Sequence, residues 1–116
     1  WVTSDLERAL YYETLPYTNK MYSCRFYRSF LQLASEVQRK DYLKNVLPKP
    51  PVLLMSGTQD MVGDKGAYAK EKAGLLIENG FDVRLEIFDG MRHSILQEVQ
   101  RENVYRLIYE FIRENI

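Results

Sequence analysis

Three prolines within four residues, Pro48, Pro50 and Pro51, divide the chain into two parts of different character. Proline has no backbone N–H donor and holds the residue before it in an extended path, so a helix cannot continue through this stretch. The part up to Pro48 contains nine aromatic residues and no glycine, whereas all six glycines lie after the prolines. We therefore expect a helical first part and a second part with tight turns.

Residues 52–112 carry strand, helix, strand and helix patterns in that order. Residues 52–56 are apolar up to a final serine and lack alternation, which predicts a strand buried on both faces. Residues 66–79 have a helical pattern that ends before Gly80, and residues 83–88 form a second strand-like run. The apolar stripe of the last helix consists of Val104, Leu107, Ile108, Phe111 and Ile112. This order predicts a right-handed crossover in a parallel sheet and an α/β fold class.

The first part is predicted to be helical, with a loop near Pro16. Its clearest element spans about residues 24–39, where apolar side chains recur at helical spacing and Ser23 is a suitable N-cap. We expect the aromatic rings of this helix to be buried against neighbouring elements. The alternative is a lid lined for an apolar ligand.

Two side chains with catalytic potential follow the two predicted strands. Asp60 comes after the first strand, and His93, the only histidine, comes after the second. Neighbouring parallel strands end at the same edge of a sheet, so we expect these two side chains to come within hydrogen-bonding reach. A carboxylate on one imidazole nitrogen fixes the tautomer in which the other nitrogen accepts a proton. The sequence thus predicts two members of a catalytic triad.

The third member, a nucleophilic serine, has no candidate in the chain. None of the serines has the flanking glycines of a Gly-x-Ser-x-Gly turn. We therefore expect the nucleophile and its oxyanion hole to precede Trp1 in a longer protein. By itself, the chain is expected to be inactive.

A specific resemblance accompanies these residues. The stretch from Pro50 to Leu96, with its strand ending in Ser56-Gly57, its TQDMVGD loop and its Gly-x-Arg-His turn, resembles the last third of the α/β-hydrolase superfamily. In particular, it resembles the branch of monoacylglycerol lipases and bacterial lysophospholipase-like proteins, which are also classed as serine aminopeptidase-type S33 hydrolases. The tail QRENVYRLIYEFI resembles their final helix, and the first part resembles their helical cap.

This resemblance implies a division of roles along the chain. Residues 1–47 correspond to the cap, or lid, and residues 48–116 to the C-terminal β-α-β-α part of the hydrolase core. Asp60 corresponds to the triad acid and His93 to the triad base. The implied reaction of the longer protein is hydrolysis of a carboxylic ester, of lysophospholipid or monoacylglycerol type, through a serine acyl-enzyme. The implied partner is a small acyl-ester or lipid substrate, with no cofactor and no metal.

Composition excludes several other classes. Sixteen basic and sixteen acidic residues give a net charge of zero, which does not favour nucleic acid binding. The single Cys24 cannot form an internal disulfide, which is typical of a reducing compartment, and we expect a cytoplasmic protein. No stretch has the length and apolar character of a membrane span.

Two alternatives from other classes remain open. Asp60, Asp64 and Asp89 could hold Mg²⁺ as in a receiver-like domain, although the triad interpretation explains His93 and magnesium does not. We interpret Asp64 as the N-cap of the following helix, which favours Asp60 as the acid. The second alternative is a non-catalytic α/β binding module whose aromatic first part docks a partner helix. Since two strands leave apolar surface and strand edges exposed, self-association of the chain is also expected.

Overall fold

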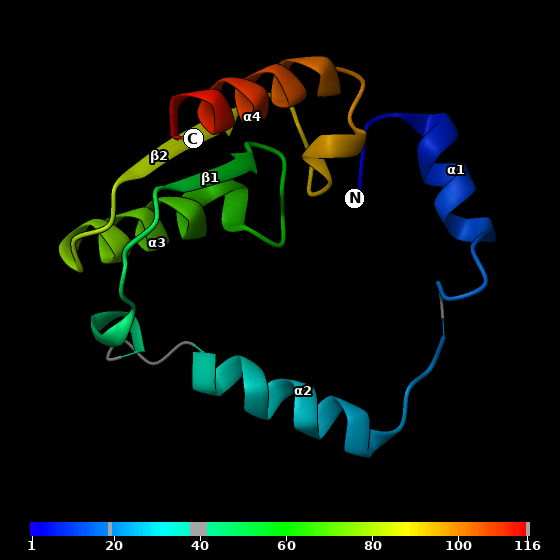
Figure 1. The fold of residues 1–116 in the computed structure, drawn as a ribbon. Helices are drawn as coiled ribbons and strands as arrows, with labels where there is room; N and C mark the ends of the chain where they lie inside the picture. Colours follow the sequence, from blue (N-terminus) through cyan, green and yellow to red (C-terminus); the bar gives the residue numbers. More distant parts are fainter. Residues whose placement is uncertain (19, 38–41, 116) are drawn as a thin grey trace.

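The computed structural model describes residues 1–18, 20–37 and 42–115. Its helices and strands follow one another along the chain as α1 (Leu6–Thr14), α2 (Cys24–Val37), β1 (Val52–Gly57), α3 (Ala67–Glu78), β2 (Val83–Phe88) and α4 (Arg101–Asn115) (Figure 1). Short 3-10 turns span Tyr42–Asn45, Asp64–Gly66 and Ile95–Gln97. Residues 38 and 39, predicted to continue α2, lie outside the described residues. Measured by length and apolar character, none of the described helices qualifies as a membrane span.

The predicted strand-helix-strand unit is confirmed. β1 and β2 pair in parallel, from Val52 opposite Val83 to Gly57 opposite Phe88, and α3 connects them. Figure 1 shows α3 and α4 on opposite sides of this two-stranded sheet. The structure is therefore a mixed α/β fold with two parallel strands flanked by helices, as the pattern predicts.

The core lies where α4 crosses the C-terminal ends of the strands. Its buried residues include Val104, which is fully buried on α4, and Met91 from the loop after β2. Met55 of β1 and Phe88 of β2 pack against them from the sheet. This small core anchors the two strand ends from which the candidate site is built.

The prediction that β1 is buried on both faces is wrong for most of its length. Residues 52–55 are only partly buried, and burial is complete only at Ser56 and Gly57. The reason is that the two strands pair only with each other among the described residues, which leaves both edges of the sheet open. An apolar run shows which residues favour burial, but it does not supply the neighbouring strands that would cover them.

The end of α3 follows the sequence prediction. Gly80 adopts a left-handed backbone with φ of 82°. Its N–H donates to Ile77 O at 2.8 Å, and the N–H of Phe81 donates to Leu76 O at 3.1 Å. This pair of bonds is a Schellman motif, which favours glycine because a Cβ is strained at this backbone angle.

The start of α3 differs from the prediction, because Asp64 is not its N-cap. Gly66 occupies the N-cap position, and no side chain caps the helix. Asp64, Lys65 and Gly66 have positive φ angles of 47°, 54° and 88°. This left-handed turn places Asp64 ahead of the helix, where its side chain does not reach the first free N–H groups of α3.

The aromatic helix α2 is capped as predicted but not buried as predicted. Ser23 Oγ accepts a hydrogen bond from Phe26 N at 3.2 Å. The rings of Tyr22 and Phe26 stack at 4.5 Å, yet Phe26 is 47% and Phe30 58% exposed. Figure 1 shows the reason: α2 lies apart from the sheet and from α3 and α4.

Gly57 gives the first testable prediction. A Cβ at this position would lie 2.1 Å from Met91 O, so a side chain there forces the loop after β2 away from β1. We expect Gly57→Ala to lower the free energy of unfolding by about 1–3 kcal/mol, measured by urea denaturation.

Gly74→Ala is the matched control, because no atom lies within 4 Å of a Cβ at this position in α3. Alanine is the better helix former, so this variant is expected to gain about 0.5–1 kcal/mol. Equal stability of Gly57→Ala and the wild-type chain would contradict the close approach of the two loops.

Candidate functional site

The loops that follow β1 and β2 are joined by backbone and side-chain hydrogen bonds. Thr58 N donates to Phe88 O at 2.9 Å, and Gln59 N donates to Met91 O at 2.9 Å. The Thr58 hydroxyl also donates to the Asp89 carboxylate at 3.0 Å. These bonds extend the strand pairing beyond the sheet, so each loop fixes the position of the other.

The joined loops place the two predicted site residues in contact. His93 Nδ1 lies 3.1 Å from Asp60 Oδ1 and 3.2 Å from Oδ2. A carboxylate can only accept, so the imidazole carries its proton on Nδ1 in this contact and leaves Nε2 as an acceptor. Asp60 is buried, with 6% exposed, whereas the His93 side chain is 42% exposed. The imidazole is thus accessible while the carboxylate that orients it is enclosed.

The environment of Asp60 favours the ionised carboxylate. Burial raises the pKa of Asp60, but hydrogen bonds from the Gly63 backbone, the His93 imidazole and the Val62 backbone lower it by more. The N–H of Val62 donates to Oδ1 at 2.9 Å. The net pKa of Asp60 is below its ordinary value of 3.8, so the group is negatively charged at neutral pH. A fixed negative charge at Nδ1 stabilises the imidazolium that forms when Nε2 accepts a proton.

The three carboxylates of the magnesium alternative do not form a cluster. Asp64 is exposed, Asp89 is bonded to Thr58, and Asp60 is bonded to His93. In the described part of the chain, no group of three His, Cys, Asp or Glu side chains is placed to hold a metal ion. That alternative therefore has no site among these residues.

Sequence reasoning missed the contribution of the N-terminal segment, residues 1–5. The Trp1 indole lies on the His93 ring, with ring centroids 5.4 Å apart and planes tilted by 37°. Ser94 N donates to Val2 O at 2.8 Å, and the Arg92 guanidinium donates to Thr3 O at 3.1 Å. Residues on both sides of His93 are thus bonded to a segment more than eighty positions away, and no periodic pattern signals such a contact.

Glu98 is the second residue that sequence reasoning missed. Its side chain is buried, with 1% exposed, and accepts hydrogen bonds from Arg92 N at 2.8 Å and from Ser4 N at 3.0 Å. The Ser4 hydroxyl donates to it as well. Burial raises the pKa of Glu98, but the bonds from Ser4, Arg92 and Val99 lower it below its ordinary value of 4.5. Glu98 therefore fastens the N-terminal segment to the loop that carries His93.

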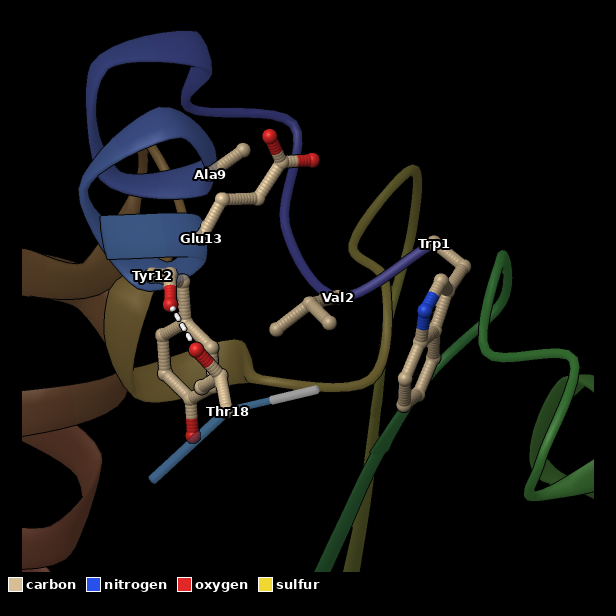
Figure 2. A pocket seen from close by; sticks show the side chains of 6 residues that line it. All are labelled: Trp1, Val2, Ala9, Tyr12, Glu13 and Thr18. Carbon is tan, nitrogen blue, oxygen red and sulfur yellow. Dashed lines mark hydrogen bonds between the residues drawn. The ribbon is translucent and has the colours of Figure 1, made fainter. Parts of the chain in front are cut away.

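A cavity of about 330 Å³ lies beside this segment (Figure 2). Its walls come from the N-terminal segment, from α1 and from the turn after α1, and consist of Trp1, Val2, Ala9, Tyr12, Glu13 and Thr18. Thr18 Oγ1 donates to Tyr12 O at 2.9 Å, which ties the turn to the helix. Trp1 therefore contacts both the cavity and the His93 ring.

The two lowered pKa values predict how stability depends on pH. Asp60 and Glu98 bind protons more weakly when folded, so the unfolded state takes up protons first as the pH falls. The stability that they provide is complete above their ordinary values of 3.8 and 4.5 and is lost as the pH falls through the lowered folded values. We expect the urea concentration at the midpoint of unfolding to be independent of pH near pH 7 and to decrease between about pH 5 and 3.

Glu98→Gln removes one of the two carboxylates whose pKa is lowered by folding. Its urea midpoint should therefore decrease less between pH 5 and 3 than that of the wild-type chain. Glu102→Gln, at an exposed position in the first turn of α4, is the matched control and should keep the wild-type slope. An unchanged acid slope in Glu98→Gln would show that Glu98 is not bonded as described.

The comparison with protein families gives a match over most of the chain. The family model described as serine aminopeptidase, S33, matches residues 1–100. No curated protein matches the chain. The match covers the N-terminal segment, both strands and both loops of the Asp–His pair. The chain therefore belongs to the serine aminopeptidase S33 family of α/β hydrolases.

Proposed function

We propose that this chain supplies Asp60 and His93 as the acid and the base of a Ser-Asp-His triad. The proposed reaction is hydrolysis of a carboxylic ester of lysophospholipid or monoacylglycerol type. The observation that carries the proposal is the 3.1 Å contact between His93 Nδ1 and Asp60 Oδ1 on an imidazole that remains 42% exposed. Family membership supports a serine hydrolase mechanism. We infer the ester substrate from the resemblance to lipases.

The geometry suits the proton transfers of acyl transfer. His93 Nε2 takes the proton of a serine hydroxyl as its oxygen attacks the ester carbonyl, and Asp60 stabilises the resulting imidazolium. The same proton then goes to the departing alcohol, which leaves an acyl-serine. Water then deacylates the serine: His93 takes a proton from water as the water oxygen bonds to the acyl carbonyl, the acyl-serine bond breaks to release the carboxylic acid, and His93 returns the proton to the serine oxygen. The serine is proposed to come from a segment that precedes Trp1 in a longer protein.

The remaining roles are part of the same proposal. Residues 1–47 form the lid over the substrate, and residues 48–116 form the part of the core that holds the acid and the base. The substrate is a small acyl ester or lipid, and the reaction takes place in the cytoplasm. The cavity beside Trp1 supports this assignment, because one of its lining residues, Trp1, also contacts the His93 ring.

Labelling of the active serine tests the triad. In the longer protein that contains this chain, a fluorophosphonate probe is expected to label the serine, and His93→Ala or Asp60→Asn is expected to slow labelling about a thousandfold or more. Asp64→Asn is the matched control, because this exposed carboxylate lies in the same loop and should not affect labelling. Undiminished labelling in His93→Ala would remove the imidazole from the mechanism.

The same preparation distinguishes the ester substrate from a peptide substrate. Lysophospholipid and monoacylglycerol hydrolysis are compared with hydrolysis of an aminoacyl anilide. Faster turnover of the acyl esters supports the proposal. Turnover of the anilide alone would be compatible with the triad, but it would show that the substrate is an N-terminal peptide bond and not an ester.

A second candidate function is binding through the exposed aromatic surface of α2. Tyr27 and Phe30 are exposed by 48% and 58%, and within the described part of the chain no further strand covers the outer edges of β1 and β2. Both features favour self-association of this chain. We expect light scattering to show a mass above that of the monomer that increases with concentration.

Phe30→Lys combined with Tyr27→Lys should lower that mass if the α2 surface contributes. Lys70→Glu on the exposed face of α3 is a control for the change of a surface charge. A monomer at all concentrations would contradict self-association.

A further inference from the structure

The peptide group between Met91 and Arg92, directly before His93, is held at both ends. Its carbonyl oxygen accepts a hydrogen bond from Gln59 N, in the loop after β1, at 2.9 Å. Its N–H donates to Glu98 Oε1 at 2.8 Å. The C=O and N–H of a trans peptide point in opposite directions, so these two bonds fix the orientation of the peptide plane. That orientation determines the direction in which the backbone enters His93.

The backbone that leaves His93 is restrained as well. Ser94 N donates to Val2 O at 2.8 Å, and Val2 belongs to the N-terminal segment. Ser4 of the same segment donates its N–H to Glu98 at 3.0 Å. Glu98 is therefore bonded directly to the peptide before the imidazole and, through the N-terminal segment, to the peptide after it.

The donors around Glu98 suit a carboxylate and no other side chain. The N–H of Arg92, the N–H of Ser4 and the Ser4 hydroxyl all donate to it, and a carboxylate offers acceptors on both oxygens. A glutamine would turn an NH₂ group toward one of these donors. The Arg92 guanidinium donates to Thr3 O at 3.1 Å, so this cation bonds to a different acceptor. The cost of burying the Glu98 carboxylate is thus offset by donors whose positions it fixes.

We propose that Glu98 is a positioning residue for the imidazole of His93. The proposal rests on the proposed function, in which His93 is the base of the triad. By holding the Arg92 N–H, the carboxylate keeps the loop in the orientation that places His93 Nδ1 against Asp60. A base whose ring is displaced by a fraction of an ångström transfers protons more slowly. Glu98 itself does not touch the reacting atoms.

A purely structural role of Glu98 makes a different prediction. In that case the side chain stabilises the N-terminal segment, and its loss lowers the free energy of unfolding without changing the contact between the imidazole and Asp60. The two roles are therefore distinguished by a measurement on the His93 ring itself.

Long-range proton–nitrogen NMR of this chain provides that measurement. Glu98→Gln is expected to lower the ratio of the Nδ1–H to the Nε2–H tautomer of neutral His93 by about threefold or more, because the ring is held less firmly against Asp60. Ser4→Ala removes only the hydroxyl donor to the carboxylate and should produce a smaller change in the same direction. Urea unfolding of each variant shows whether it folds cooperatively.

Tyr105→Phe is the matched destabilising control. It removes the 2.8 Å bond from the Tyr105 hydroxyl to Leu96 O, in the short turn that ends just before Glu98. It leaves the bond between the Arg92 N–H and Glu98 in place. We expect this variant to be less stable than the wild-type chain but to keep the wild-type tautomer ratio.

Fluorophosphonate labelling of the longer protein tests the consequence for the reaction. Glu98→Gln is expected to slow labelling about tenfold or more while the apparent affinity for the probe stays unchanged. In the Asp60→Asn background the same substitution should cost little more, because the contact that Glu98 supports is already lost. Glu102→Gln, exposed on α4, should label at the wild-type rate.

Three results would overturn the proposal. The first is a wild-type tautomer ratio in Glu98→Gln or, if that variant does not unfold cooperatively, in Ser4→Ala. The second is an equal change of the ratio in Tyr105→Phe, and the third is full additivity of the labelling losses of Glu98→Gln and Asp60→Asn. The NMR measurement needs no serine. A changed ratio without any serine labelling would therefore refute the triad alone, whereas loss of labelling in His93→Ala with no effect of Glu98→Gln would refute only the positioning role.

Discussion

The Asp60–His93 contact depends on the parallel register of β1 and β2. The last paired residues, Gly57 and Phe88, lie directly before the two loops, and hydrogen bonds from Thr58 and Gln59 continue the pairing into them. Gly57 has no side chain, which lets the second loop approach to a distance that a Cβ would prevent. The sheet thus sets the position of a carboxylate and an imidazole that are 33 residues apart.

The N-terminal segment adds a second layer to this arrangement. A buried carboxylate such as Glu98 is costly unless donors surround it, and here the donors come from Ser4 on one side and Arg92 on the other. The same group therefore stabilises the segment that carries Trp1 and the loop that carries His93. This explains how a proposed lid segment and the loop that carries the proposed base share one structural support.

Much of this core could be predicted from local patterns and one topological rule. Prolines 48, 50 and 51 mark its beginning, Gly80 ends α3 as expected, and the meeting of Asp60 with His93 follows from parallel strands ending at one edge. The rest depends on contacts that leave no periodic signal.

Glu98 and Trp1 act across more than ninety residues, and nothing in their local sequence marks them. Asp64 has the residue type of a cap but the backbone of a left-handed turn. The amphipathic pattern of α2 correctly predicts a helix, yet a pattern does not say whether anything covers its apolar face.

The most direct test of the Asp60–His93 contact is a long-range proton–nitrogen NMR spectrum of the imidazole. Its signals are unambiguous because His93 is the only histidine. We predict that the neutral form of the imidazole carries its proton on Nδ1 and that it changes toward the Nε2 tautomer in Asp60→Asn. A proton on Nε2 in both proteins would contradict the Asp60–His93 contact.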